Sequence, residues 1–203
     1  MIPDYWPEAK SHLSKRDKVL RKLVKLYPDA DLGTRGDAFQ TLARSITGQQ
    51  ISVKAAQAIW GRFVLACGKV TPANVVAIAP EKLRACGFSG QKTAYILDLA
   101  MRFHTGLVKP RRFARMDDEA IIEELVQVKG IGRWSVEMFL IFHLMRPDVL
   151  PVDDLGLRRA MEKQYNKGEP LTRDDMRRIG EAWKPYSSVG TWYLWRSLDP
   201  VSF

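Results

Sequence analysis

Residues 128–134 read VKGIGRW and separate two stretches that have the hydrophobic spacing of helices. The stretch before them, residues 117–127, begins with acidic residues, which the N-terminus of a helix favours. The stretch after them starts at Arg133 and is largely apolar through Met145. Because glycine adopts positive φ at low cost, two glycines around one aliphatic residue permit a tight turn. The segment predicts two helices joined by a hairpin, residues 128–132.

This hairpin has the features of a phosphate-binding turn. Amide N–H groups in the turn, and in the first turn of the next helix, have no intrahelical partner, and such groups bind phosphate at the positive helix end. Ile131 can anchor the turn in the core, although an ordinary helix–helix turn would look the same. The basic connector at residues 109–115 favours a DNA backbone as the partner. The predicted DNA contacts are Lys129, Gly130, Ile131, Gly132 and Arg133.

Helical spacing continues along the rest of the chain. Residues 20–27 and 56–64 each carry one apolar stripe, and Ser52 is a suitable N-cap. Prolines that follow residues 71 and 79 are typical of helix starts, and Thr172 with Asp175 resembles a capping box. We find no alternating strand pattern and no internal repeat. The sequence predicts an all-α fold of about ten short helices.

Composition narrows the class of protein. The chain has 203 residues, a net charge of +9 and a pI of about 9.7, with 46% hydrophobic residues. These values indicate a packed globule of one domain or two small lobes, and a polyanionic partner, for which nucleic acid, a membrane surface and the ribosome are the alternatives. Two cysteines exclude a disulfide framework and any four-cysteine zinc or iron–sulfur site. We expect no cofactor.

The cellular location follows from two absences in the sequence. Residues 1–10, MIPDYWPEAK, carry acids and prolines where a signal peptide needs a basic start and an apolar stretch. The apolar run at residues 138–142 is far shorter than the roughly 20 residues of a membrane helix. We expect a soluble intracellular monomer with no membrane partner, cytoplasmic and associated with the nucleoid in a bacterium, or nuclear in a eukaryote.

About 20 residues after the hairpin, residues 150–159 read LPVDDLGLRR. The hairpin GIGRW, the apolar helix and this acid before the next helix resemble the helix-hairpin-helix (HhH-GPD) DNA glycosylases. Three further segments resemble the 3-methyladenine DNA glycosylase II branch: residues 39–56 (FQTLARSITGQQISVKAA), residues 83–100, which include GFSGQKTAYILDLA, and residues 183–195 (WKPYSSVGTWYLW). The resemblance covers about residues 37–195.

The resemblance implies a fold of two helical lobes around a cleft. One lobe would span about residues 37–115, and the other would combine residues 1–36 with about 116–203 and carry the hairpin. Larger bacterial members of the family have an additional N-terminal β-rich domain. Because this chain starts near the helical part, we expect that domain to be missing.

The resemblance also implies one catalytic carboxylate. Aligned through the following Leu-Gly-Leu-Arg, the family position falls on Asp154, with Asp153 as the alternative. Either residue could instead serve only as the N-cap of a helix over residues 155–165. An ionised carboxylate beside the sugar C1′ would stabilise the oxocarbenium-like charge that develops when the N-glycosidic bond breaks.

The base pocket and the reaction type follow from the same comparison. The family's pocket positions correspond to Trp134, Met138 and Trp195, although tryptophan on an amphipathic helix is more often part of a core. Aromatic faces suit a cationic base. Relatives that also cut the strand carry a lysine where this chain has Trp134, and an indole cannot form a Schiff base. We therefore expect a monofunctional enzyme.

Two further features are implied by the resemblance. The loop that enters the duplex corresponds to Gln49, Gln50 and Ile51, with Gln50 at the tip, unless these glutamines only cap the helix ends. In DNA-bound relatives, hairpin carbonyls hold a monovalent cation. The corresponding carbonyls here belong to Val126, Val128 and Ile131.

The sequence thus predicts a glycosylase that removes alkylated purines, such as 3-methyladenine and 7-methylguanine, from double-stranded DNA in base-excision repair. Two alternatives stay open. The same scaffold could act on hypoxanthine, ethenoadenine or uracil, or the chain could be a hairpin DNA-binding module without catalysis.

Overall fold

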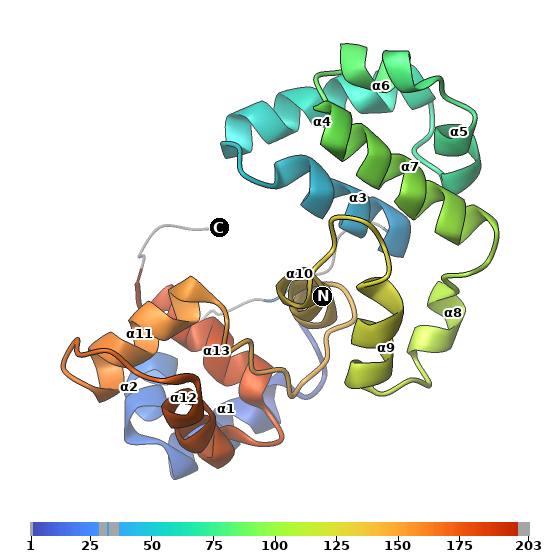
Figure 1. Cartoon of the computed structure of the whole chain (residues 1–203). Helices are drawn as coiled ribbons and strands as arrows, with labels where there is room; N and C mark the ends of the chain where they lie inside the picture. The colour runs from blue at the N-terminus through green and yellow to red at the C-terminus, as the bar shows by residue number, and fades with distance from the viewer. Residues whose placement is uncertain (1, 29–31, 33–36, 199–203) are drawn as a thin grey trace. The chain divides into compact units, whose positions relative to one another are not determined.

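The computed structural model describes residues 2–28, 32 and 37–198. Within these ranges every regular element is a helix, thirteen α and one 3-10 in number, and no strand occurs (Figure 1). The predicted all-α class is confirmed. There are more helices than expected because some, such as the four-residue α8 (Pro110–Phe113), are too short to show a period. None of the described helices is long and apolar enough to cross a membrane.

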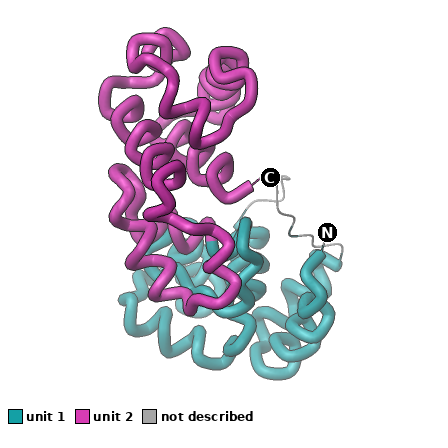
Figure 2. Tube along the Cα trace, turned by 90° about the vertical axis from the view of Figure 1, so that its right-hand side faces the viewer, with its two compact units in different colours: residues 1–34, 140–203 teal, residues 35–139 magenta. Residues whose placement is uncertain are grey.

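The chain divides into two compact units, which Figure 2 colours separately. Unit 1 comprises Met1–Thr34 and Leu140–Phe203, and unit 2 comprises Arg35–Phe139. The boundary therefore falls within α10 (Arg133–Phe142), whereas the family resemblance placed it near residue 115. As a result the hairpin belongs to unit 2 and not to the unit that contains the N-terminal residues.

Unit 1 contains α1 (Trp6–Arg16), α2 (Lys18–Leu26), α11 (Leu155–Tyr165), α12 (Arg173–Gly180), the 3-10 helix η1 (Glu181–Trp183) and α13 (Ser187–Arg196). The last turn of α10 also lies in this unit. The predicted capping box at the start of α12 is present, since the Thr172 and Asp175 side chains each accept from the other's backbone N–H.

The carboxylate of Asp17 links three elements of unit 1. Its Oδ1 caps α2 by accepting from the N–H groups of Val19 (2.8 Å) and Leu20 (3.0 Å). Its Oδ2 accepts from the hydroxyl of Tyr165 (2.8 Å) and from Nε1 of Trp183 (3.0 Å). Burial and the Asp17 charge raise the pKa of Tyr165. This buried polar network joins α2, α11 and η1.

Unit 2 contains α3 (Ala38–Gly48), α4 (Val53–Cys67), α5 (Pro72–Val76), α6 (Pro80–Ala85), α7 (Gly90–His104), α8, α9 (Asp118–Leu125) and most of α10. Helix α7 packs against α3, α5 and α6 (Figure 1). Fully buried Phe63 lies between Trp60 and Phe88, with ring centroids 5.5 and 5.3 Å away. The predicted helix starts at Ser52, Thr71 and Pro80 are confirmed.

The basic stretch at residues 109–115 is partly helical, so its interpretation as a connector is wrong. Pro110 occupies the first position of α8, where its missing N–H costs nothing. Phe113 is 1% exposed and contacts Phe139 with ring centroids 5.9 Å apart. Burial of one aromatic ring holds this short helix in place, while its arginines stay exposed.

Candidate functional site

Asp154 sits at the N-cap of α11, in unit 1. Its Oδ1 accepts from the N–H of Leu157 (2.6 Å) and from the indole Nε1 of Trp195 on α13 (2.7 Å). The first bond is an N-cap, the role that the sequence left open for either aspartate, and it places the carboxylate at the positive end of a helix. The donor of the second bond lies 41 residues further along the chain, and this bond fixes the orientation of the Asp154 side chain. Asp154 is therefore a half-buried, oriented carboxylate.

Asp153 lies in a different environment. Its side chain is exposed and pairs with Arg173, with Nε and Oδ1 2.5 Å apart. Arg173 is the first residue of α12, and the pair is open to solvent. A solvent-exposed ion pair orients a carboxylate weakly and contributes little energy. The geometry therefore favours Asp154 over Asp153 as the site carboxylate.

The indole that contacts Asp154 also packs against a second aromatic ring. Trp195 stacks on Phe142, with ring centroids 5.6 Å apart and planes at 16°. A Cβ added at Gly156 would lie 3.1 Å from Asp154 Oδ1 and 3.3 Å from Trp195 Cδ1. Glycine at this position thus leaves the space in which the carboxylate and the indole meet.

Trp134, Met138 and Phe142 follow one another at i, i+4 and i+8, so they share one face of α10. Trp134 is 46% exposed and Phe142 38% exposed, while Met138 is half-buried. Phe142 is not among the site residues that the resemblance implies. The four-residue spacing from Trp134 and Met138 is the signal that would have found it, and its stack on Trp195 makes it part of the Asp154 site.

The turn of the hairpin is shaped by one glycine. Gly130 has φ of +79°, and a Cβ there would lie 2.1 Å from Cδ2 of Tyr95 on α7. Gly132 is not among the glycines with positive φ, so the expectation that both residues supply it is wrong for Gly132. That residue directly precedes α10, and among the described residues other than its chain neighbours no heavy atom lies within 4 Å of its added Cβ. Its backbone is thus open to close approach.

Some backbone N–H groups of the hairpin can bind an anion, whereas others already donate a hydrogen bond within the protein. Ile131 is 5% exposed and anchors the turn, as predicted. The Lys129 N–H donates to Asp98 Oδ2 (2.9 Å). Among the described residues, the N–H groups of Gly130 and Gly132 donate to no other group. These two amides can therefore receive an anion.

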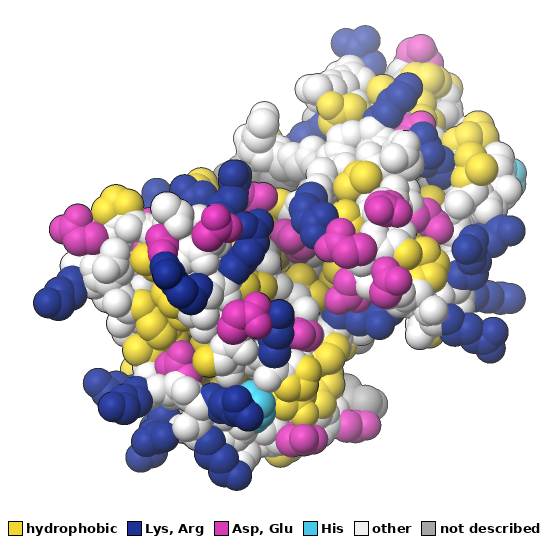
Figure 3. Space-filling view, turned by 60° about the horizontal axis from the view of Figure 1, so that its bottom comes forward, with side chains coloured by type: hydrophobic (Ala, Val, Ile, Leu, Met, Phe, Trp, Pro, Cys, Tyr) yellow, Lys and Arg dark blue, Asp and Glu magenta, His cyan; other side chains and the backbone are white. Residues whose placement is uncertain are grey.

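The charge at the hairpin is smaller than the sequence suggested. Arg133 forms a bidentate pair with Glu119 and also contacts Glu137, 3.2 Å from Nε to Oε1. The Arg133 guanidinium lowers the pKa of Glu119 by hydrogen bonding. Lys129 stays exposed. Figure 3 shows basic side chains at several separate places on one face, with acidic side chains gathered among them.

The three carbonyl oxygens that the resemblance assigns to a cation can accept such a ligand. In the described part of the chain, the carbonyls of Val126 and Ile131 accept no hydrogen bond, whereas that of Val128 accepts from the Ile131 N–H (3.1 Å). A carbonyl has two lone pairs, so all three oxygens retain capacity for a ligand.

The loop of Gln49, Gln50 and Ile51 joins α3 to α4. The side-chain Nε2 of Gln49 donates to the Gly130 carbonyl (2.8 Å), so this residue links the loop to the hairpin. Gln50 is exposed and has φ of +56°, a conformation that residues other than glycine seldom adopt. Ile51 is 38% exposed. Gln50 and Ile51 are thus both exposed to solvent.

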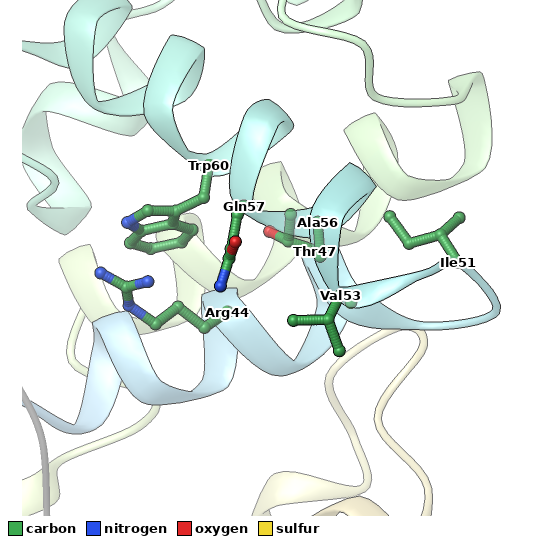
Figure 4. Close-up of a pocket in the computed structure, with 8 residues that line it drawn as sticks. Arg44, Thr47, Ile51, Val53, Ala56, Gln57 and Trp60 are labelled. Atoms are coloured by element: carbon green, nitrogen blue, oxygen red, sulfur yellow. The ribbon is translucent and has the colours of Figure 1, made fainter. Parts of the chain in front are cut away.

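A cavity of about 190 Å³ lies beside this loop, between α3 and α4. Figure 4 shows Trp60 and Arg44 on one side and Ile51 on the loop at the other. The guanidinium of Arg44 lies 4.1 Å from the centroid of the Trp60 ring. Val53, at the rim, is 75% exposed. Most of the surface that lines the cavity is apolar, although Arg44, Thr47 and Gln57 also line it.

Several known proteins are similar to this chain. DNA-3-methyladenine glycosylase 1 of Schizosaccharomyces pombe is 35% identical over 198 residues, which cover 94% of this chain and 86% of that protein. The solved structure of the Schizosaccharomyces pombe 3-methyladenine DNA glycosylase (Mag1) in complex with abasic DNA matches with a TM-score of 0.80, over 94% of this chain and 96% of that one. A DNA-3-methyladenine glycosidase from Bacillus halodurans matches with a TM-score of 0.87 at 35% identity, over 94% and 88%.

The similarity extends to a family. Residues 43–185 match the model of the HhH-GPD superfamily base excision DNA repair proteins, and these residues include the loop, the hairpin and Asp154. The family match and the relative at 35% identity show that this chain belongs to the HhH-GPD superfamily.

Proposed function

We propose that this chain is a monofunctional DNA glycosylase that removes alkylated purines, of the 3-methyladenine and 7-methylguanine class, from double-stranded DNA in base-excision repair. The observation that carries the proposal is the oriented carboxylate of Asp154, held by a helix N-terminus and an indole. The relatives named for 3-methyladenine support the substrate class.

The proposed chemistry requires one carboxylate. When the N-glycosidic bond breaks, positive charge develops at C1′ of the sugar, and the charge of Asp154 stabilises it. The same carboxylate orients the attacking water. An alkylated purine already carries positive charge and departs as a neutral base, so no strong general acid is needed at the leaving group.

The DNA contacts follow from the open backbone groups. The Gly130 and Gly132 amides hold a phosphate at the start of α10, and Lys129 adds charge. The carbonyls of Val126, Val128 and Ile131 would hold a monovalent cation, whose charge would attract a phosphate. Gln50 and Ile51 enter the duplex and fill the gap when the base is rotated out of the stack. The exposed Trp134 indole offers an aromatic face to a cationic base.

The proposal excludes strand cleavage, because Trp134 stands where relatives that cut the strand carry a lysine, and it cannot form a Schiff base. Both activities are tested by incubating the protein with duplexes that contain 3-methyladenine, 7-methylguanine, hypoxanthine, ethenoadenine or uracil. We expect release of the two methylated bases, abasic sites and no adduct on borohydride reduction. Release of hypoxanthine or uracil alone would overturn the substrate class, a trapped adduct would overturn monofunctionality, and binding without abasic sites would indicate a DNA-binding module.

A further inference from the structure

One face of α7 contacts both the loop of residues 49–51 and the hairpin. Lys92, Tyr95 and Asp98 are spaced by three residues, so they lie on that face. All of these elements lie within unit 2. The contacts differ in kind, since Lys92 reaches the loop and the other two residues reach the hairpin.

The ammonium of Lys92 caps the C-terminal end of α3. Its Nζ donates to the carbonyl of Thr47 (2.8 Å) and to that of Gln49 (2.6 Å). Carbonyls at the C-terminal end of a helix lack intrahelical partners and carry the negative end of the helix dipole, so a cation suits them. Lys92 is half-buried, and burial lowers the pKa of its ammonium. Lys92 thereby fixes the backbone on the N-terminal side of Gln50.

The other contacts connect the same loop to the hairpin. Gln49 donates through its side chain to the Gly130 carbonyl (2.8 Å). The ring of Tyr95 lies against Gly130, where it leaves no space for a side chain. Asp98 accepts from the Lys129 N–H and pairs with Arg102 at 3.0 Å. The chain Lys92–Gln49–Gly130 therefore runs continuously from α7 through the loop to the hairpin.

Gln50 shows the consequence of these restraints. A left-handed backbone in a residue other than glycine persists only where its surroundings impose it. Here the preceding residue is held at both its carbonyl and its side chain. Gln50 itself is exposed at the tip of the loop.

We propose that Lys92 is a positioning residue for base flipping: it sets, together with Gln49, the spacing between the inserting loop tip at Gln50 and the hairpin that holds the strand. This inference rests on the proposed function. It assigns Lys92 a role in rotating the base out of the duplex and none in breaking the glycosidic bond.

The test compares Lys92→Met with the wild type on two substrates under single-turnover conditions. One duplex carries 7-methylguanine opposite cytosine. The other duplex carries 7-methylguanine in a one-nucleotide bulge, where the base is unpaired and no base pair has to be broken before it rotates out. Lys82→Met is the matched control, because it removes an exposed lysine of α6 in the same unit. Lys92→Arg tests whether a longer cation restores the contact.

We expect Lys92→Met to slow excision of the paired lesion by about tenfold, equivalent to about 1.4 kcal/mol, and of the bulged lesion by less than about twofold. Lys92→Arg should recover part of the loss, and Lys82→Met should match the wild type. Equal slowing on both substrates, or none on the paired lesion, would overturn the inference. If Lys92→Met does not fold, Gln49→Met must give the same difference between substrates. A wild type inactive on both duplexes would instead refute the proposed function.

Discussion

Gly156→Ala separates the geometry of the candidate catalytic site from the stability of the protein. The new methyl group would lie 3.1 Å from Asp154 Oδ1 and 3.3 Å from Trp195 Cδ1, so carboxylate and indole must move apart by a few tenths of an ångström. A misplacement of 1 Å can cost about 100-fold in rate, which predicts a loss of about three- to tenfold here. Alanine is also the better helix former, by up to about 1 kcal/mol, which offsets the crowding.

The assay is single-turnover excision of an alkylated purine, together with a thermal melt. We expect Gly156→Ala to melt within about 2 °C of the wild type and to excise more slowly. Gly61→Ala is the matched control, because Gly61 lies in the exposed interior of α4 and, in the described part of the chain, its added Cβ would meet no atom within 4 Å beyond its neighbours and the backbone of its own helix. It should raise the melting temperature by about 1–4 °C without changing excision. Wild-type excision by Gly156→Ala would refute the role assigned to the Asp154–Trp195 contact.

Three other variants test separate parts of the structure. Trp195→Phe keeps a ring that can stack on Phe142 but removes the donor to Asp154; excision should fall by about tenfold or more with DNA affinity unchanged, because a hydrogen bond to a charged group contributes about 1.5–3 kcal/mol. Glu119→Gln removes the charge that pairs with Arg133, so the affinity for undamaged duplex DNA should rise. The plot of log affinity against log salt concentration should become steeper by up to about 0.9. Asp17→Ala removes the acceptor of four donors and should lower the free energy of unfolding in urea by about 3 kcal/mol or more. An unchanged value in any of the three measurements would contradict the corresponding assignment.

Local features of the fold could be predicted from the sequence because they depend on neighbouring residues. The capping box at Thr172, the cap at Asp154 and the turn at Gly130 each depend on residues within four positions along the chain. The same kind of rule predicts the start of α8 at Pro110. The positive charge around Pro110 nevertheless favours an open connector when the sequence alone is considered.

Long-range contacts could not be predicted in this way. Gln49 and Gly130 are 81 residues apart, and no periodicity connects a glutamine side chain to one carbonyl of a distant turn. Arg133 was predicted to contact DNA because its positive charge directly follows the hairpin. Its pairing with Glu119 depends on how α9 packs beside the hairpin, which only the three-dimensional structure shows.

Excision by Asp154→Asn, set beside Asp153→Asn, tests the central claim most directly. Asparagine keeps the oxygen that accepts from Leu157 and Trp195, so the cap survives while the negative charge is removed. We predict that Asp154→Asn lowers the single-turnover rate of abasic-site formation on methylated duplex DNA by about 100-fold or more. Asp153→Asn should stay within about threefold of the wild type, because its carboxylate is exposed and paired with Arg173. Near wild-type turnover by Asp154→Asn, or a greater loss with Asp153→Asn, would contradict the account.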